Sequence, residues 1–314
     1  MLDARHATSA SSIKSRFGLI YMFFYILYRF GYMLANILPL RVAYSLAERF
    51  SDMHFYIAAK DRKAVAENLS AVLKKDINEC YALARNVFRN FGLYMVDFFR
   101  LVRLDKNAIE KRVRFIGLEN IDKSLELNRG AILISGHIGN WEMGGVAVAM
   151  KGYDISCVAL NHKHKNINDF FIRQREDKGM KVITMSSTMK RCVTTLSNNG
   201  LLALVGDRDF ANTGIILDFF GVPASIPKGP AMLSLKMNSP IVPTFFIREN
   251  RFNYKMIFEK PLEIKETPGM GKDEVLKEMT KEMVRVIEKY VREYPEQWLV
   301  FRRFWEIPAD AFVL

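Results

Sequence analysis

Cysteine is scarce in this sequence, and its few cysteines lie far apart. The 314 residues contain three, Cys80, Cys157 and Cys192. Their odd number and wide spacing argue against a disulfide framework and against a zinc site. Reduced thiols in a cytosolic compartment are the better interpretation.

Several catalytic motifs are also missing. The sequence has no Gly-x-Ser-x-Gly elbow for a serine nucleophile and no His-Glu-x-x-His pair for zinc. Residues 268–273 superficially resemble a phosphate loop, but Glu266 replaces its first glycine and Asp273 stands where a Ser or Thr must reach magnesium. A serine hydrolase, a zinc peptidase and a P-loop nucleotide-binding protein are therefore set aside.

Acidic residues are outnumbered by basic ones, 34 to 46, which gives a net charge of +12. Half of the residues are apolar and a quarter are charged, so the chain is not globally disordered. The positive charge favours an acidic partner, which could be nucleic acid, an anionic membrane surface or an acidic protein such as acyl carrier protein. No nucleic-acid-binding module is recognisable, and the aromatic residues occur in apolar runs. We therefore expect no nucleic-acid partner.

The N-terminal region contains the longest apolar stretch. Residues 17–28 are uncharged, Arg29 interrupts the run, and residues 30–40 continue it. A bilayer-spanning helix needs about 20 apolar residues, so this stretch could span only if Arg29 snorkels or faces protein. We expect residues 1–40 to be a membrane anchor with a cytoplasmic N-terminus, either spanning the bilayer or lying in its interface. A buried core helix is the alternative.

The remainder, residues 41–314, is predicted to be one domain. Residues 41–112 read as a helical lead-in, and residues 113–314 alternate between strands and helices. This alternation predicts an α/β fold with a single mixed sheet flanked by helices. The expected strands are 131–135, 154–160, 180–184, 200–206, 240–247 and 254–259, and the expected helices are 140–150, 167–178, 187–198, 228–237 and 272–292.

A histidine and a carboxylate follow the first of these strands. His137 is one of only five histidines, and Glu142 comes five residues later. Two residues at this spacing within one helix would point about 140° apart. The pair can meet only if His137 lies in the turn and Glu142 in the first turns of the helix, a bend that Gly136 and Gly139 permit. We expect the two side chains to form a general-base pair.

The segment Ser-Gly-His-Ile-Gly-Asn-Trp-Glu, residues 135–142, resembles the His-x4-Asp/Glu signature of the bacterial lipid A late acyltransferases, the lauroyl and myristoyl transferases. Phosphatidylinositol mannoside acyltransferases are similar. The resemblance covers roughly residues 17–306, and its other segments follow in the family's order: 39–47, 62–69, 206–210, 219–224, 295–298 and 302–304. It implies a glycerolipid-acyltransferase-like fold.

The resemblance also implies roles for further residues. Arg208 would bind a phosphate of donor or acceptor, and Asp207 or Asp209 would order the site; the alternative is a polar turn held by its own ion pairs. Arg175 matches an Arg-x3-Gly feature and is carried over as an anion or oxyanion stabiliser. Asn140, within the motif, is a further candidate for substrate binding. The segment 219–224 reads equally well as a core strand with a turn or as part of the acyl-chain wall.

Taken with the resemblance, these residues predict a membrane-associated O-acyltransferase. The donor would be an acyl thioester on acyl carrier protein, with coenzyme A as the alternative, and the acceptor a hydroxyl of a lipid A precursor. His137 would deprotonate this hydroxyl while Glu142 holds the other ring nitrogen, without an acyl-enzyme. Backbone N–H groups of the turn and helix start, or Arg175, would stabilise the oxyanion.

No metal or nucleotide cofactor is expected. We expect the protein at the inner membrane, with its active site on the cytoplasmic side. The basic stretch that begins at residues 162–165 would be either a solvated helix face or a docking surface for the carrier protein or for lipid headgroups. Other acceptors, a glycerolipid or a phosphatidylinositol mannoside, remain possible, as does a non-catalytic lipid-binding protein of the same fold.

Overall fold

The computed structural model describes residues 22, 24–162, 164–184, 188–210, 212–263 and 270–305. Residues 1–21, which include much of the predicted anchor, lie outside the described residues. Residues 24–37 form a helix whose inner face packs against the rest of the protein, with Ala35 buried and Tyr28 edge-on to Phe171. Within the described ranges, no helix combines the length and the apolar character that crossing a membrane requires.

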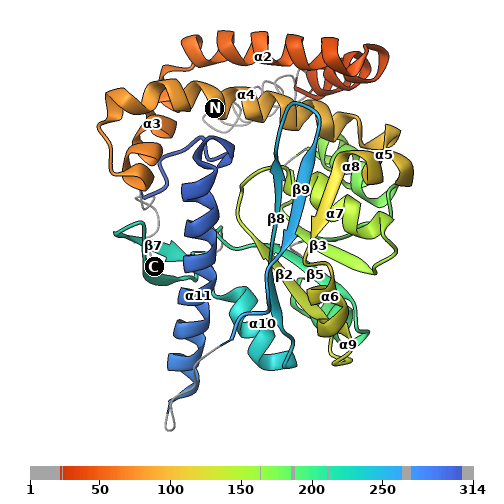
Figure 1. Cartoon of the computed structure of the whole chain (residues 1–314), viewed down its shortest axis with the longest axis vertical. Helices are drawn as coiled ribbons and strands as arrows, with labels where there is room; N and C mark the ends of the chain where they lie inside the picture. Colours follow the sequence, from red (N-terminus) through yellow and green to blue (C-terminus); the bar gives the residue numbers. More distant parts are fainter. Residues whose placement is uncertain are drawn as a thin grey trace, which may run out of the picture.

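The chain before the sheet is helical. It consists of α2 (Leu40–Ile57), α3 (Ala59–Leu73) and α4 (Ile77–Phe99), followed by the 3₁₀ turn η1 (Leu101–Arg103) and the short α5 (Lys106–Arg112). Asp76 caps α4 by accepting a hydrogen bond from the Asn78 N–H, as expected for an N-cap aspartate. Helices α2 and α4 lie side by side across one end of the sheet (Figure 1).

The core is a seven-stranded sheet in the order β1-β9-β8-β2-β5-β3-β4. All neighbouring strands run parallel except β8 and β9, so the predicted mixed sheet is confirmed. Six strands match predicted ranges, whereas β1 was not predicted. The strands are β1 (Val113–Ile116), β2 (Ala131–Ser135), β3 (Ile155–Ala159), β4 (Lys181–Thr184), β5 (Leu201–Val205), β8 (Ile241–Arg248) and β9 (Tyr254–Phe258).

A separate antiparallel hairpin, β6 (Ile215–Phe219) and β7 (Val222–Ile226), stands apart from this sheet. Its turn contains Phe220 and Gly221, both at positive φ. This arrangement agrees with a core strand and a turn in segment 219–224. Phe219 and Phe220 are buried against Trp298 in the C-terminal segment.

Helices cover both faces of the sheet, which explains why its central strands are apolar at consecutive positions. On β2, Ala131 and Leu133 belong to the cluster that includes α4, α7 and α8, whereas Ile132 and Ile134 face the side of α9, α10 and α11. The helices of this part are α6 (Glu119–Leu125), α7 (Trp141–Met150), α8 (Lys165–Glu176), α9 (Thr188–Ser197), α10 (Gly229–Met237), α11 (Lys272–Glu293) and the 3₁₀ turn η3 (Pro295–Gln297).

Candidate active site

Two neighbouring parallel strands bring His137 and Asp207 together. Strands β2 and β5 pair in register, with Ser135 opposite Val205 at their carboxyl ends. Each strand continues through one glycine into a polar residue, Gly136-His137 after β2 and Gly206-Asp207 after β5. Because the strands end at the same level, their next side chains face each other, as is usual at the carboxyl edge of a parallel sheet.

The carboxylate of Asp207 holds His137 at two points. The Nδ1 atom of His137 lies 2.6 Å from Oδ1 of Asp207, and the His137 backbone N–H donates to Oδ2 at 2.9 Å. Trp298 Nε1 donates to the same Oδ2 at 3.1 Å. Burial alone would raise the pKa of Asp207, which is 0% exposed, but the charge of His137 and these hydrogen bonds lower the pKa below its ordinary value. Asp207 is therefore an ionised partner of the imidazole.

The turn around His137 is fixed by strand β8 and by the C-terminal segment. Gly139 adopts φ +65°, and a Cβ there would meet the Phe246 carbonyl oxygen at 2.0 Å, so the turn requires glycine. The Gly139 N–H donates to the carbonyl of Gln297 and the Asn140 N–H to that of Phe246. The His137 N–H donates to Asp207. All three of these backbone N–H groups therefore already donate within the protein, so they are not free to stabilise an oxyanion as predicted.

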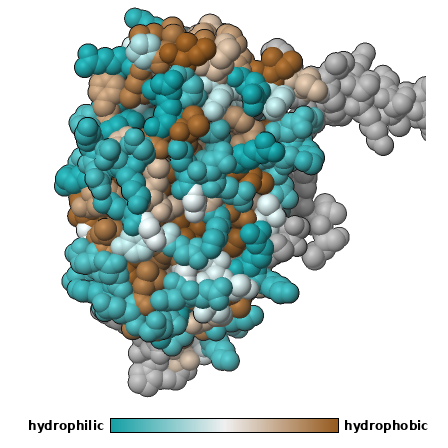
Figure 2. Space-filling view, turned by 90° about the vertical axis from the view of Figure 1, so that its right-hand side faces the viewer, coloured by the Kyte–Doolittle hydropathy of each residue, from teal (hydrophilic) through white to brown (hydrophobic). Residues whose placement is uncertain are grey.

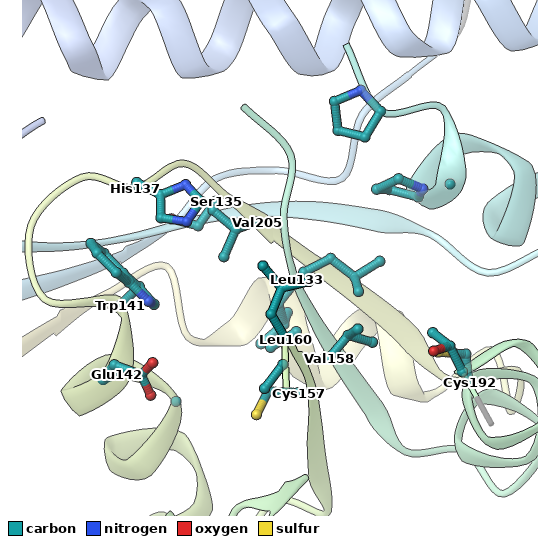
Figure 3. Close-up of a pocket in the computed structure, with 18 of the residues that line it drawn as sticks. Leu133, Ser135, His137, Trp141, Glu142, Cys157, Val158, Leu160, Cys192 and Val205 are labelled. Atoms are coloured by element: carbon teal, nitrogen blue, oxygen red, sulfur yellow. The ribbon is translucent and has the colours of Figure 1, made fainter. Parts of the chain in front are cut away.

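Glu142 does not pair with His137 in this structure, which differs from the pairing predicted from the motif. Both of its carboxylate oxygens accept from Arg175, at 2.6 Å each, in a bidentate ion pair. Glu142 is the second residue of α7, and Arg175 lies in the last turn of α8. Trp141 lies edge-on to His137, with ring centroids 5.0 Å apart, and occupies the space between His137 and Glu142 in the view of Figure 3.

The ion pair also changes what Arg175 can do. Its guanidinium is packed over the ring of Phe98, and the side chains of Arg175 and Glu142 are 10% and 11% exposed. Burial alone would lower the pKa of Arg175, but the charge and hydrogen bonds of Glu142 raise it above its ordinary value. The guanidinium thus neutralises Glu142, and its predicted contact with an anion or oxyanion stays a prediction.

Removing one partner of this pair should destabilise the fold. We expect Glu142→Gln to lower the free energy of unfolding by about 3–5 kcal/mol, because Arg175 would keep a buried charge without a counter-charge. The double variant Glu142→Leu with Arg175→Met should recover most of this loss, since neither charge remains. Chemical denaturation measures both.

A matched control is the exposed pair of Asp154 and Lys181, whose side chains are 53% and 61% exposed. Asp154→Asn should cost less than about 1 kcal/mol. Equal costs for Glu142→Gln and Asp154→Asn would contradict the assignment of Glu142 to a stabilising buried pair.

His137 stands at one side of a cavity of about 680 Å³. The lining is mainly apolar and comes from β2, β3, β5, α7 and the loop before α10. Figure 3 shows His137, Trp141 and Glu142 along one side, with Cys157, Val158 and Leu160 near its centre. A cavity of this size and character fits a hydrophobic ligand with one polar end.

The other predicted site residues are distributed differently from expectation. Asn140 is 2% exposed; its Oδ1 caps α7 at the Met143 N–H, and its Nδ2 points to Asp97, so it shapes the turn rather than facing the cavity. Asp207 likewise lies behind His137. Asp209 lines the cavity but also closes a turn by accepting from the Gly214 N–H and Ser225 Oγ, and its contact with substrate stays a prediction.

The sequence matches a known protein family. The sequence profile described as "Bacterial lipid A biosynthesis acyltransferase" matches residues 12–306. The chain belongs to this family.

Relatives within the acyltransferase family carry two kinds of name. A phosphatidylinositol mannoside acyltransferase of Mycobacterium tuberculosis is 30% identical over 168 residues, which cover 52% of this chain and 53% of that protein. A lipid A biosynthesis acyltransferase of Haemophilus influenzae is 23% identical over 62% of this chain and 59% of its own length. A lipid A biosynthesis palmitoleoyltransferase of Escherichia coli is 23% identical over 71% of both chains. This chain thus spans about half the length of the mycobacterial relative.

One residue of the candidate site, Trp298, has no role that the sequence alone predicted. Trp298 donates to Asp207, and the adjoining Leu299 N–H donates to the His137 carbonyl. Trp298 is the last residue of the segment Pro-Glu-Gln-Trp at 295–298, which the sequence marks only as part of the family resemblance, and Leu299 follows it. The contact between this segment and the site around His137 could not be predicted from the sequence, because no spacing rule connects residues so far apart along the chain.

Proposed function

We propose that this protein is a membrane-associated O-acyltransferase that moves an acyl group from a thioester donor to a hydroxyl of a phosphorylated glycolipid. The observation that carries the proposal is the pair of His137 and Asp207 at the side of a large apolar cavity. The cavity would hold the acyl chain, and the family supports the reaction type.

In this mechanism His137 acts through Nε2. Because Nδ1–H donates to Asp207, Nε2 is the basic atom, and it removes the proton of the acceptor hydroxyl. The oxygen attacks the thioester carbonyl and forms the new C–O bond. The tetrahedral intermediate then breaks its C–S bond, and the departing sulfur takes the proton from the imidazolium. The positive end of α7, which begins at Trp141, would stabilise the oxyanion.

Direct transfer, without an acyl-enzyme, is supported by the cavity's thiols. Burial raises the pKa of Cys157 to about 12 and that of Cys192 to about 11, so both remain protonated at neutral pH and are poor nucleophiles. Among the described side chains, His137 is hydrogen-bonded to Asp207 and to no serine, threonine or cysteine.

The acceptor and donor are tested together by product analysis. Purified protein would be incubated with acyl carrier protein thioesters or acyl-coenzyme A and with a lipid A precursor, a phosphatidylinositol mannoside or a lysoglycerolipid. Mass spectrometry should show one new ester on one acceptor. Binding of these lipids without any acylated product would favour a non-catalytic lipid-binding protein instead.

Carrier protein remains our proposed donor because of the net charge of +12. The basic stretch is less available for docking than its sequence suggests. Lys178 donates to the carbonyls of Val102 and Leu104, and Lys165 pairs with Asp169. Lys163 lies outside the described residues. Lys165 remains 85% exposed in its ion pair, so a docking surface for the carrier could combine Lys165 with other exposed cations.

Membrane association is supported by two exposed apolar stripes. The helix of residues 24–37 exposes Phe24, Leu27, Phe30, Met33 and Ile37, and α2 exposes Val42, Leu46, Phe50, Met53 and Ile57. Figure 2 shows apolar side chains gathered at the end of the molecule where α2 lies in Figure 1. The sequence predicted a membrane anchor in residues 1–40 only, whereas the apolar stripe on α2 lies beyond residue 40. A patch of this kind is typical of an interfacial membrane contact.

The stripe on α2 can be tested without altering the site. Phe50 and Ile57 are 59% and 72% exposed, so replacing both by glutamate should leave the fold intact. We expect partition onto anionic phospholipid vesicles to fall by roughly tenfold or more, since each side chain contributes about 1.5–3 kcal/mol when buried. Vesicle sedimentation measures this.

The control is Leu127→Glu. Leu127 follows α6, away from α2 in Figure 1, and is 50% exposed. Its replacement should leave partition unchanged. Unchanged partition of the α2 variant, or an equal loss in the control, would remove α2 from the membrane contact.

A further inference from the structure

Two arginines from distant parts of the chain contact the same aromatic ring beside the site. Arg208 follows Asp207, and its guanidinium carbon lies 4.6 Å from the centroid of the Phe210 ring. Arg302, in the segment after η3, places its guanidinium carbon 5.8 Å from the same centroid. Phe210 in turn stands edge-on to His137, with ring centroids 6.2 Å apart. Two positive charges thus gather next to the proposed general base.

These arginines differ from others nearby because no carboxylate among the described residues forms an ion pair with them. Arg303 pairs with Glu67, Arg248 with Asp97, and Arg175 with Glu142. The Nε atom of Arg208 is buried and has no hydrogen-bond partner in the described part of the chain. A buried donor without an acceptor is costly, so such an atom is a candidate for binding a ligand.

The two charges also act on each other. Burial lowers the pKa of Arg208, and the nearby charge of Arg302 lowers it further, while the charge of Asp207 opposes this shift without cancelling it. Contact with Phe210 offsets this repulsion only in part, since a cation–π contact contributes about 0.5–2 kcal/mol. An anion between the guanidinium groups would relieve the repulsion and supply the missing acceptor.

The family resemblance already implies a phosphate contact for Arg208. We propose that Arg302 joins Arg208, so that the two guanidinium groups bind one phosphate of a substrate at the ring of Phe210 and beside His137. Guanidinium groups suit phosphate because their N–H donors match its oxygens in bidentate geometry. Phe210 also lines the apolar cavity, so a bound phosphate would sit at the polar boundary of the acyl-chain site. The ligand is a phosphate-bearing substrate of the proposed acyl transfer, on which this inference rests.

The phosphate could belong to the acceptor headgroup or to the phosphopantetheine arm of the donor. An acceptor headgroup can carry its phosphate close to the reacting hydroxyl, whereas the long pantetheine arm separates the donor's phosphate from its thioester. The acceptor is therefore the favoured source for a site beside His137. The experiment therefore needs a binding measurement that does not depend on turnover, and a kinetic comparison that separates donor from acceptor.

Binding is measured by titrating the full-length protein with inorganic phosphate and following phosphorus NMR line width. We expect Arg208→Gln and Arg302→Gln each to weaken binding by roughly tenfold or more, the loss typical of a hydrogen bond to a charged group. Arg303→Gln is the matched control, because it removes a neighbouring cation that already pairs with Glu67. Arg302 is exposed, so its variant remains informative even if Arg208→Gln fails to fold.

The kinetic comparison uses substrates with and without phosphate. The variants should raise KM for acyl-coenzyme A but not for an acyl N-acetylcysteamine thioester if the donor's phosphate binds here. They should raise KM for a phosphorylated acceptor, but not for its dephosphorylated form, if the acceptor's phosphate binds here.

Two results would overturn the site: phosphate binding equal in the wild type and both variants, or an equal loss in Arg303→Gln. Phosphate binding that depends on Arg208 and Arg302 in a protein that forms no acylated product would retain the anion site. That outcome would count against the proposed function alone.

Discussion

Replacement of His137 by glutamine is expected to lower kcat for acyl transfer by about 10²–10⁴-fold, the contribution typical of general-base catalysis. The glutamine amide can still donate to Asp207, but it cannot take a proton from the acceptor. Glutamine is preferable to alanine, because alanine would leave Asp207 fully buried without its main partner. Single-turnover measurement with saturating donor and acceptor isolates the chemical step.

The control for this variant is His54→Gln. His54 lies on α2, and its side chain is 53% exposed and near Asp61. Its replacement should leave kcat unchanged. Near-wild-type kcat for His137→Gln, with chemistry still rate-limiting, would contradict the role of His137 as the base.

Replacement of Asp207 by asparagine should lower kcat by up to about 10⁴-fold, the loss seen when the aspartate of a serine-protease triad is changed to asparagine. The asparagine amide can donate to Nδ1, which would place the ring proton on Nε2, the atom that must be basic. The expected signature is a large fall in kcat with a smaller change in KM. Melting temperature should be measured in parallel, because Asp207 also accepts from Trp298.

The stability effect of Asp207→Asn should depend on pH in a defined direction. The pKa of Asp207 is lower in the folded protein than its ordinary value of 3.8, so the unfolded chain binds more protons in this range. The stabilisation from the ionised carboxylate is therefore present above pH 4 and is lost as pH falls through the folded pKa. The difference in unfolding free energy between wild type and variant should shrink accordingly in acid.

Comparison with Glu142 distinguishes the two carboxylates. In the structure Asp207 holds the imidazole, whereas Glu142 holds Arg175. Asp207→Asn should therefore act mainly on kcat and Glu142→Gln mainly on stability. If a folded Glu142→Gln protein lost turnover while Asp207→Asn kept it, the pairing expected from the motif would describe the active enzyme better.

Much of the fold could be predicted because its signals are local. Strand β2 consists of four buried apolar residues followed by Ser135, and glycines lie on both sides of it. Apolar residues also dominate the other predicted strands. Strand β1 escaped prediction because its four residues include the exposed Arg114 and directly follow α5. A short edge strand of this kind forms because it pairs with β9, and its own composition does not favour a strand strongly.

The sequence could not predict which face of α2 is exposed. Its apolar positions recur at spacings of three and four, a pattern that normally marks a buried helix face. The structure instead buries Tyr44 and Phe55 and leaves Phe50 and Ile57 exposed. Which of two apolar faces is covered depends on the position of α4, and that position is set by the packing of the whole lead-in.

By itself, the sequence determined which loops carry the site. The apolar runs that end at Ser135 and Val205 each lead through a glycine to a polar residue. These signals lie within a few consecutive residues, so they can be recognised without knowing the fold. Only the tertiary structure decided which side chains meet. His137 pairs with Asp207, 70 residues away, because β2 and β5 are adjacent and in register. Glu142, five residues away, turns instead to Arg175 on α8. Strand order and helix packing arise from burial of the entire core, so spacing in the sequence cannot specify these partners.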